Sequence, residues 1–476
     1  MSKTDRIAPH AEGAEYFAAR SLRKGSVSWV LLVSLGVSYT ISGDFSGWNY
    51  GMEHGGWAGL FLAFAVMGTM YACTVFGLAE LASAIPTTGA GFGFARCALG
   101  RAGGFATGLA LTIEYVCAPA AISTFIANYL IALGIFPGVD PFLLVVGVYV
   151  VFTAIHVIGV GEALKLMLVI SGIAVVALVA FVVGAAGSFN PANLFDIAPT
   201  DALGASTLFP HGVAGVLASL PYGIWFFLGV EGVPLAAEEA VDPRRDMPRG
   251  LIWAMAVLTV TGLASLVFAA GAVGAAAMAG SDAPLVEALA YLGRPELAAF
   301  VNVAGLAGLV ASFFSLMYAG SRQVFALARS GYLPSFLALT GTRKTPVAAL
   351  LCSAAVGLAL VAVMHDGALI LNVAVFGACV SYALMNLSHI VLRRRATALQ
   401  RTYLTPGGAR TTTVALVLSC VAVVSTFFVD MVAVACVVAV YALGMTFFFV
   451  YSRSRLVSNA PEEEFARMSA AEAQLR

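Results

Sequence analysis

About twelve long apolar runs follow one another along this chain, and they restrict its fold more than any other feature of the sequence. A run of roughly 20 apolar residues can cross the hydrocarbon core of a membrane as a helix. Backbone groups inside lipid must be hydrogen-bonded within the protein, so only helices or a closed barrel can cross. These runs are continuous rather than alternating, which favours helices. The 476 residues are 60% hydrophobic and 11% charged, whereas soluble domains average about 25% charged residues. We therefore predict an all-α membrane protein with about 12 transmembrane helices.

Short loops join most of the expected spans, and the longer connections are 86–101, 188–212 and 276–296. The approximate span cores are 28–53, 57–84, 102–134, 140–159, 163–187, 213–240, 250–275, 297–328, 346–364, 367–391, 411–429 and 431–452. The expected organisation is an N-terminal tail (1–25), a first five-helix repeat (26–187), an extracellular loop (188–212), an inverted second five-helix repeat (213–392), helices 11 and 12 (393–452) and a C-terminal tail (453–476).

Glycines and one acid interrupt the first and sixth spans. The first break reads Ile41-Ser42-Gly43-Asp44-Phe45-Ser46-Gly47, and the second reads Phe227-Leu228-Gly229-Val230-Glu231-Gly232. Each break opens a unit of about five spans, and an odd repeat places the second copy upside down relative to the first. Broken helices at matching places in two halves indicate a transporter's binding site near the middle of the membrane.

Lys and Arg concentrate in every second loop, which predicts the orientation of the chain in the membrane. Basic residues precede the first span and recur in alternate connections, at Arg20, Arg23, Lys24, Arg96, Arg101, Lys165, Arg244, Arg245, Arg249, Arg322, Arg329, Arg343, Lys344, Arg393, Arg394, Arg395, Arg401, Arg410, Arg453 and Arg455. In the opposite loops, Arg294 is the only basic residue among acids. We expect a multi-pass protein of the plasma (inner) membrane with both termini in the cytoplasm.

The sequence lacks motifs for other kinds of chemistry. The seven cysteines are scattered without zinc-ligand spacing, and the six histidines form no ligand cluster. No P-loop, catalytic triad or polynucleotide-binding basic run is present. We therefore expect neither an enzyme nor a nucleic-acid-binding protein, and no metal or cofactor. The expected partners are the lipid bilayer and a small substrate, with H⁺ or Na⁺ as the candidate coupling ion.

Four acids, Asp44, Glu80, Glu114 and Glu231, lie well inside the expected spans. A carboxylate at mid-membrane is costly and is a functional-site candidate. No Lys or Arg shares the depth of these acids, so we expect them to lack a fixed cationic partner. An unpaired buried carboxylate takes up a proton or binds a mobile cation, which favours a cationic substrate or coupling ion.

Structural roles compete with this interpretation. Asp44 would repel a substrate carboxylate, which favours an ammonium compound without an acid group, but it could instead cap the second half-helix. Glu231 could cap its own half-helix or act as a gate. Glu80 lies near the cytoplasmic end of its span, where a packing role is expected, and Glu114 faces either the site or a water pocket.

Aromatic residues gather around the second break, where an ammonium over a ring face gains about 0.5–2 kcal/mol. Trp225 precedes the unwound stretch, and we expect its ring to close over the site, with Tyr115 and Phe227 as walls; ordinary helix packing explains most other aromatics. Ser312 and Ser315 in the eighth span are candidate Na⁺ ligands together with carbonyls of the first break, although serines also pack helices.

Several motifs resemble those of the amino acid–polyamine–organocation (APC) superfamily over nearly the whole chain. They are Ala79-Glu80-Leu81, Ile85-Pro86-Thr87-Thr88-Gly89-Ala90-Gly91, Trp225-Phe226-Phe227-Leu228-Gly229-Val230-Glu231, Glu238-Glu239-Ala240-Val241-Asp242-Pro243-Arg244-Arg245-Asp246-Met247-Pro248 and Arg322-Gln323-Val324-Phe325-Ala326-Leu327-Ala328-Arg329-Ser330-Gly331-Tyr332-Leu333-Pro334. The resemblance implies a LeuT-like fold with unwound first and sixth helices that bind substrate, and a gating aromatic at Trp225. Members with different substrates share the acid at Glu231, which favours a structural role for it.

Within that superfamily, the segments 41–51 and 113–121 look like the ethanolamine permease branch. Amino acid members tend to carry a Gly-Ser-Gly-type first break, from which Asp44 departs. Some proton-coupled relatives place a Lys in the fifth span at the sodium site, where Gly172 aligns in this chain.

These observations together predict a secondary active transporter that imports a small organic amine cation, with ethanolamine favoured, by alternating access. The predicted binding residues are Asp44, Ser42, Gly43, Glu114, Tyr115, Trp225, Phe227, Gly229 and Glu231, with Trp225 and Glu231 also gating. The alternative is an amino acid or polyamine permease, or antiporter, of the same superfamily.

Overall fold

The computed structural model describes residue 25 and residues 27–86, 89–158, 161–341, 345–396 and 399–456, with backbone alone at 161–166. Within these ranges the chain is a bundle of helices without a β-strand. Eleven of the described helices are long and apolar enough to cross a membrane. The prediction of an all-α membrane protein is therefore confirmed.

The eleven long helices, with short 3-10 continuations of three of them, follow the expected spans closely. They are α4 (Tyr50–Ala84), α5 (Ala90–Ala132), α6 (Pro141–Ile158), α7 (Gly161–Ala186), α8 (Gly212–Trp225) continued by η2 (Val230–Glu239), α9 (Pro243–Val273), α12 (Pro295–Arg329), α13 (Val347–Met364), α14 (Gly367–Arg395), α15 (Ala409–Ser425) continued by η4 (Thr426–Phe428), and α16 (Met431–Val450) continued by η5 (Ser452–Ser454). Two further 3-10 turns, η1 (Pro191–Phe195) and η3 (Ser335–Ala338), lie in connections.

The first predicted span is divided among three elements. Its first half is α2 (Trp29–Thr40) followed by the single turn α3 (Ser42–Phe45), and its second half is the start of α4. Gly56, at φ +68°, bends α4 between the end of this span and the start of the next. Among the described residues, α2 and the eleven long helices together account for the twelve predicted crossings.

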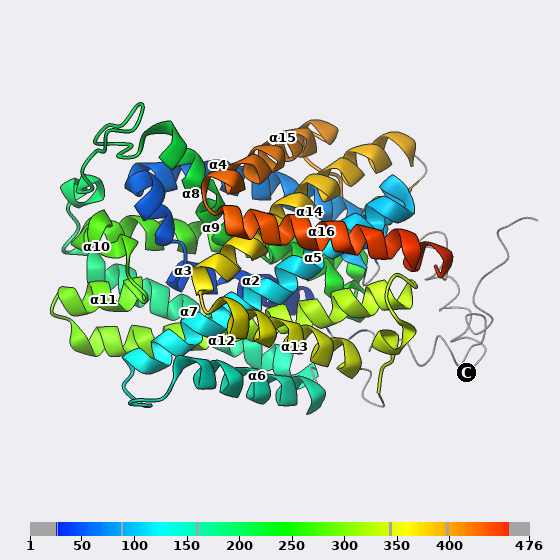
Figure 1. The fold of residues 1–476 in the computed structure, drawn as a ribbon, viewed down its shortest axis with the longest axis horizontal. Coiled ribbons are helices and arrows are strands. Elements are labelled where there is room, and N and C mark those ends of the chain that lie inside the picture. The colour runs from blue at the N-terminus through cyan, green and yellow to red at the C-terminus, as the bar shows by residue number, and fades with distance from the viewer. Residues whose placement is uncertain are drawn as a thin grey trace, which may run out of the picture.

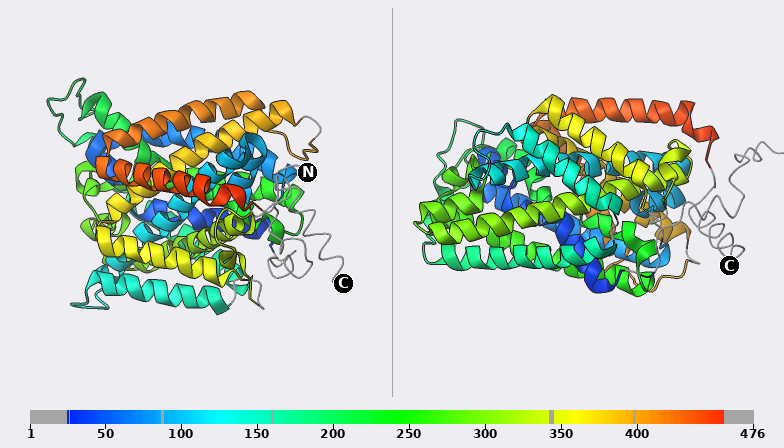
Figure 2. Two further views of the ribbon diagram at one scale, coloured as in Figure 1. Left: turned by 45° about the vertical axis from the view of Figure 1, so that its right-hand side comes forward. Right: turned by 90° about the horizontal axis from the view of Figure 1, so that it is seen from below.

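The long helices run side by side, so that their ends form the two ends of the molecule (Figure 1). The pieces α2 and α3 lie in the middle of the bundle, whereas α6 lies along one edge of it in Figure 1 and α16 along one edge in the right-hand view of Figure 2. Burial follows this arrangement, because 83% of the most apolar window of α5 is buried but only 22% of that of α16. The interrupted first helix is therefore surrounded by protein.

Contacts between helices agree with two exchangeable halves of five spans each. Helix α4 contacts α8 in the same way that α9 contacts α2. Likewise, α5 contacts α14 as α12 contacts α7, and α5 contacts α6 as α12 contacts α13. Helices at equivalent places in the two halves, such as α4 with α9 and α5 with α12, also touch. The helix pairing thus matches the predicted five-plus-five organisation, with α15 and α16 outside it.

Two connections contain helices that the sequence analysis did not predict. The connection 276–296 forms α10 (Ala275–Ala279) and α11 (Pro284–Tyr291), and α11 buries Leu285, Ala288 and Leu289 on one face. This spacing gives a short amphipathic helix a core-facing side. The helix α5 begins at Ala90 rather than near 102, with a bend at Gly100 (φ +77°).

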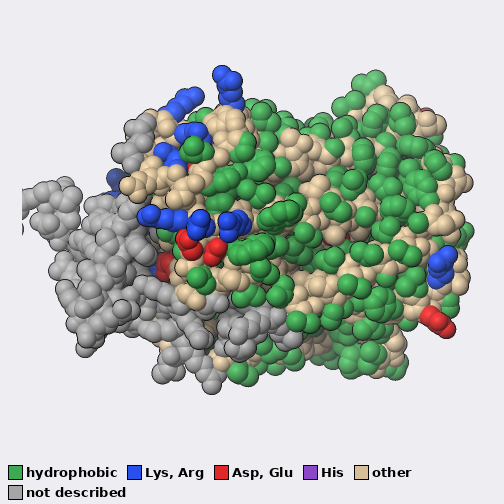
Figure 3. Space-filling view, turned by 180° about the vertical axis from the view of Figure 1, so that it is seen from behind, with side chains coloured by type: hydrophobic (Ala, Val, Ile, Leu, Met, Phe, Trp, Pro, Cys, Tyr) green, Lys and Arg blue, Asp and Glu red, His purple; other side chains and the backbone are tan. Residues whose placement is uncertain are grey.

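The molecular surface has a hydrophobic middle and more polar ends. On the face in Figure 3, Lys and Arg side chains gather at one end, and hydrophobic side chains cover the middle. This distribution fits a membrane-crossing bundle. The predicted tails fall largely on 1–24 and 457–476, which lie outside the described residues, so the cytoplasmic placement of the termini stays a prediction.

Candidate functional site

The first break lies slightly later in the chain than its glycines suggest. Ile41 keeps helical angles (φ −59°, ψ −21°), and Ser42, Gly43 and Asp44 belong to the single turn α3. The backbone becomes extended at Ser46 (φ −157°, ψ 156°) and left-handed at Gly47 (φ +90°). Asp44 is therefore on the last helical turn before the break.

Asp44 is fully buried, and neither carboxyl oxygen accepts a hydrogen bond from the described residues. The next helix, α4, begins at Tyr50 without a side-chain cap, so the alternative role of Asp44 as a cap of the second half-helix is wrong. The Thr261 hydroxyl approaches this carboxyl group, but its recorded hydrogen bonds return to the carbonyls of Val257 (3.1 Å) and Leu258 (3.4 Å). The structure thus leaves Asp44 without the helix-capping partner that would give it a structural role.

Asp44 and the rings of Phe64 and Phe226 all lie close to Gly262 in α9, which has no side chain. A Cβ placed on Gly262 would lie 2.9 Å from Phe226, 3.0 Å from Phe64 and 3.1 Å from Asp44 Oδ1. The two rings pack edge to face with centroids 5.0 Å apart. This acid, Phe64 and Phe226 are called the Asp44 site below.

The α3 turn touches the second break directly. A Cβ on Gly43 would lie 2.6 Å from the Trp225 carbonyl oxygen, so only glycine permits this approach. The second break itself contains Gly229 at φ +106°, between α8 and η2. The hydroxyl of Thr40 donates to the carbonyl of Leu228 at 3.0 Å, which joins the two breaks again.

Glu231 accepts hydrogen bonds from the backbone of the second break and from tyrosine hydroxyls. Its Oε2 accepts the Gly229 N–H at 3.2 Å, and its Oε1 accepts the Tyr115 hydroxyl at 3.2 Å. Stabilising a break through a backbone N–H is the structural role that the sequence analysis left open for Glu231. The continuation η2 is a 3-10 helix rather than the expected α-helix.

Glu114 and Glu231 lie within hydrogen-bonding reach of each other. The Tyr382 hydroxyl donates to Glu114 Oε1 at 3.3 Å and also pairs with the Tyr71 hydroxyl, which approaches Glu231 at 3.5 Å. Glu114 Oε2 has no hydrogen-bond partner in the described chain. Two adjacent buried carboxyl groups cannot both hold a negative charge without a large penalty, so the pair shares a proton or binds a cation.

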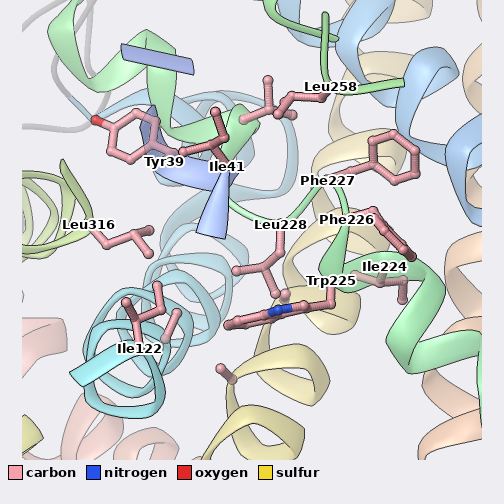
Figure 4. Close-up of a cluster of buried hydrophobic side chains, with 14 of the residues drawn as sticks. Tyr39, Ile41, Ile122, Ile224, Trp225, Phe226, Phe227, Leu228, Leu258 and Leu316 are labelled. Carbon is pink, nitrogen blue, oxygen red and sulfur yellow. The ribbon is translucent and has the colours of Figure 1, made fainter. Parts of the chain in front are cut away.

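Trp225 links the two breaks. Its indole N–H donates to the carbonyl of Ser46 at 2.9 Å, and its ring packs edge-on to Phe125 with centroids 6.3 Å apart. In Figure 4 the indole extends beneath Leu228 toward Ile122, while Phe226 and Phe227 point the other way. Phe227 packs against Phe64 and Tyr71, and thus belongs to the side of the glutamate pair.

The two candidate sodium ligands, Ser312 and Ser315, differ in their hydrogen bonding. Ser312 Oγ accepts the backbone N–H of Ser42 at 3.0 Å, whereas Ser315 Oγ has no partner among the described residues. The expectation that Gly172 occupies the fifth-span position of that site is wrong, because Gly172 is exposed and no atom lies within 4 Å of its Cβ position. Ser171 faces the first span instead, and its hydroxyl lies 2.5 Å from that of Ser38.

Glu80 contradicts the expectation that all four acids lack cationic partners. Its carboxylate lies 2.5 Å from Arg393, 3.0 Å from Arg401 and 3.2 Å from His389, and it accepts the Thr405 N–H at 2.8 Å. These partners come from α14 and the connection after it, more than 300 positions away in the chain. The predicted packing role of Glu80 therefore takes the form of a buried ion cluster.

A second set of ion pairs joins η2 to α12. Glu239 accepts from Arg322 at 3.0 Å and from the Tyr318 hydroxyl at 2.7 Å, and Glu238 pairs with Arg329 at 2.8 Å. The Val27 N–H donates to the Glu239 carbonyl at 3.0 Å. These contacts tie the start of the first span to the end of the sixth on the side predicted to be cytoplasmic.

Comparison with known proteins decides the family. The amino acid permease family matches residues 30–458. The chain belongs to the amino acid permease family. Relatives include the methylthioribose transporter of Bacillus subtilis (strain 168), 26% identical over 73% of this chain and 76% of the relative. The branched-chain amino acid permease of the same organism is 25% identical over 73% and 77%, and a probable GABA permease of Pseudomonas aeruginosa is 27% identical over 66% and 67%.

Membership places this amino acid permease homologue among membrane transporters of the APC superfamily rather than among enzymes. The relatives' names cover several amino acids and methylthioribose, so the family alone does not select a substrate. Substrate specificity must therefore come from side chains of this chain itself, above all from Asp44 and from the pair Glu114 and Glu231.

Four contributors were missed by the sequence analysis as site residues: Phe64, Tyr71, Gly262 and Tyr382. They lie in spans two, seven and ten, outside the two breaks, and no local pattern marks them among many similar residues. Tyr115 was expected beside the ammonium together with Asp44, but the structure places its hydroxyl on Glu231.

Proposed function

We propose that this permease imports a small organic amine cation, ethanolamine, by alternating access, with the ammonium group paired to Asp44. The observation that carries the proposal is the fully buried Asp44 carboxylate, which has no cation as a recorded partner among the described residues and only the Thr261 hydroxyl near it. A mobile cation that binds beside Asp44 removes the penalty of an uncompensated buried charge.

The surroundings of Asp44 support an ammonium group. Phe64 and Phe226 reach the same point as the carboxylate, and ring faces attract organic cations by about 0.5–2 kcal/mol. The Trp225 carbonyl beside Gly43 is a further acceptor for an N–H donor when the site opens.

The same carboxylate argues against a substrate with its own acid group. Two like charges a few ångströms apart in a low-dielectric site repel by several kcal/mol. Ethanolamine offers an ammonium and a hydroxyl and no carboxylate, so it meets Asp44 without this repulsion.

A proton is the coupling ion that we propose. Glu114 and Glu231 share their space without a recorded Lys or Arg contact in the described chain, and two adjacent carboxyl groups exchange one proton readily. In this chain the glutamate pair is the proposed proton carrier.

Uptake of labelled ethanolamine into proteoliposomes tests the proposal. We expect wild-type uptake to be blocked by methylamine-type amines, and Asp44→Asn to abolish uptake while eluting as a folded protein. Wild-type rates in that variant, or strong block by alanine or arginine with none by amines, would contradict the proposed substrate.

The coupling ion has a separate test. An imposed inward proton gradient should accelerate uptake in the wild type, and Glu114→Gln should remove this acceleration while leaving counterflow exchange measurable. Acceleration by a sodium gradient alone would transfer the coupling role to the Ser312 and Ser315 region.

The second candidate is an amino acid permease of the same fold. The observation that favours it is the set of relatives named for amino acids, including branched-chain amino acids and L-asparagine. Amino acid uptake that survives Asp44→Asn would select this candidate, because a substrate carboxylate does not need that acid.

A further inference from the structure

A cavity of about 410 Å³ opens at the start of α9, at the bundle end predicted to be cytoplasmic, and we call it the arginine pocket. Two segments that lie far apart in the chain line it. The start of α9 and the connection between α14 and α15 together contribute Asp242, Arg244, Arg245, Pro248, Arg249, Thr402 and Tyr403. The Thr402 hydroxyl joins the two segments, because it donates a hydrogen bond to the Arg244 carbonyl at 2.9 Å.

The three arginines of the pocket have no carboxylate partner among the described residues. Four other arginines at the same predicted end each form an ion pair with a glutamate; they are Arg322, Arg329, Arg393 and Arg401. In the described chain no such pair includes a pocket arginine, although the Asp242 carboxylate lines the same cavity. Three exposed guanidinium groups thus face one carboxylate, and the pocket has an excess of positive charge.

Stabilisation of α9 does not explain these arginines. Arg244 and Arg245 lie in the first turn of α9, where the helix dipole favours anions over cations. The orientation of the chain in the membrane requires positive charges at this end, but it does not require that they line one cavity. An anion bound in the cavity offsets both the repulsion among the guanidinium groups and their unfavourable position at the helix start.

Tyr403 adds a neutral hydrogen-bond donor to the pocket. Burial, and to a smaller extent the charge of Glu80, raises the pKa of the Tyr403 hydroxyl, so the hydroxyl keeps its proton. Guanidinium groups suit phosphate oxygens, because they donate several hydrogen bonds in a fixed plane. A hydroxyl donor beside them suits the remaining oxygens, and the donors of the pocket therefore fit a phosphate group.

An exposed apolar stripe on α9 continues from the pocket along the helix. Arg245, Arg249 and Trp253 follow one another at intervals of four residues and share one helix face, which Val260 extends. Trp253 is 58% exposed and Val260 is 69% exposed. Exposed apolar side chains of a membrane-crossing helix face lipid, and Trp is common at the level of the headgroups. The stripe thus offers a surface for acyl chains, which a phospholipid needs and a free phosphate does not.

We propose that the arginine pocket binds the phosphate group of an anionic phospholipid of the cytoplasmic leaflet, with the acyl chains lying along Trp253 and Val260. Basic pockets on the cytoplasmic side of membrane helices recognise such headgroups by charge. The proposal holds for any substrate that the protein carries, because none of these residues belongs to the two breaks.

The connection that lines the pocket also carries part of the Glu80 cluster. Arg401 lies 3.0 Å from the Glu80 carboxylate, and the Thr405 N–H donates to that carboxylate at 2.8 Å. The pocket residues Thr402 and Tyr403 lie between these two in the chain. A ligand that binds only the folded protein stabilises it, so the bound lipid supports the segment that neutralises Glu80.

Quenching of Trp253 fluorescence by brominated lipid tests the proposal in the full-length protein reconstituted into phosphatidylcholine vesicles. A small share of the lipid carries bromine on its acyl chains and is either phosphatidylglycerol or phosphatidylcholine. The Trp253→Phe protein identifies the part of the signal that comes from Trp253. We expect brominated phosphatidylglycerol to quench Trp253 more strongly than the same amount of brominated phosphatidylcholine, and unlabelled phosphatidylglycerol to reverse this quenching.

Variants of the pocket should change the preference for phosphatidylglycerol in opposite directions. Replacing any one pocket arginine with Gln should weaken it roughly fivefold, whereas replacing all three with Lys should retain most of it. Asp242→Asn should strengthen the preference, and it removes no helix cap, because the Asp242 side chain accepts no N–H of α9. Arg410→Gln is the matched control, since Arg410 is an exposed arginine in the first turn of α15, outside the pocket lining.

Two outcomes would overturn the site: equal quenching by the two brominated lipids in the wild type, or equal losses in Arg410→Gln and in the pocket variants. Millimolar inorganic phosphate at constant ionic strength distinguishes the two sources of a phosphate group. We expect it to leave the quenching by brominated phosphatidylglycerol unchanged. Complete displacement of that lipid would show that the pocket binds free phosphate and would overturn its assignment to a phospholipid.

Discussion

The Trp225 indole N–H donates a 2.9 Å hydrogen bond to the Ser46 carbonyl. Trp225 is the last residue of α8, and Ser46 is the first extended residue after α3. One side chain therefore connects the two interrupted helices across the middle of the bundle. A neutral hydrogen bond contributes about 0.5–1.5 kcal/mol, which is enough to bias an opening equilibrium without locking it.

Replacing Trp225 with Phe keeps an aromatic ring but removes the N–H donor. We expect the closed state to lose about 1 kcal/mol, a roughly fivefold shift toward opening, and thus faster ethanolamine counterflow with weaker retention. Stopped-flow exchange in proteoliposomes measures both. Trp57→Phe is the matched control, because the Trp57 indole also donates to a carbonyl, that of Leu266 at 3.0 Å, away from the breaks. Equal effects of the two variants would remove the gating role.

Gly262→Ala tests the Asp44 site by volume rather than by charge. The added methyl would lie about 3 Å from Phe226, Phe64 and Asp44, and overpacking of this kind typically costs about 1–3 kcal/mol. We expect kcat/KM for ethanolamine to fall at least tenfold. Gly172→Ala, a helical position in α7 with no atom within 4 Å, should transport normally. An unaffected Gly262→Ala variant would place substrate elsewhere.

Much of the fold was predictable because lipid imposes a strict length and polarity on each crossing. The ends of α6, α13, α14 and α16 lie within a few residues of the predicted spans. The exceptions have local causes. Glycines in left-handed conformations at Gly56 and Gly100 let one helix continue across two predicted units, and α11 forms because three apolar residues share one face.

The site was less predictable because its partners come from distant spans. The two breaks and Asp44 were visible as glycines and an acid inside apolar runs. The arginines that neutralise Glu80 were also visible, but only the packing of α14 against α4 brings Arg393 to it. Likewise, no one-residue rule distinguishes Phe226, which meets Asp44, from Phe227, which packs on Tyr71.

Glu80→Gln should destabilise the protein more than it alters substrate affinity. The substitution leaves Arg401 and His389 facing an uncharged amide in a buried cluster. Breaking a buried ion pair costs about 3–5 kcal/mol, and we expect the lower end because Arg393 is 29% exposed. Thermal unfolding in detergent should show a lower midpoint, with ethanolamine KM unchanged in the surviving protein. Glu296→Gln, an exposed acid, is the control. A large KM change at a normal midpoint would contradict a purely structural role.

Glu239→Gln should weaken the closure on the side predicted to be cytoplasmic. Glu239 holds Arg322 at 3.0 Å and the Tyr318 hydroxyl at 2.7 Å, and both ion-pair members are nearly inaccessible. Loss of the carboxylate leaves the buried guanidinium unpaired, which favours conformations that admit water to it. We expect ethanolamine binding from the outside to weaken roughly tenfold as the outward-facing population falls. Labelling of a cysteine introduced at Ser321 should rise in parallel. The double variant Glu239→Gln, Arg322→Gln removes the stranded charge, and it should recover part of the outside affinity if charge pairing sets the closure. An unchanged labelling rate in Glu239→Gln would show that Glu238 with Arg329 suffices to hold the two spans together.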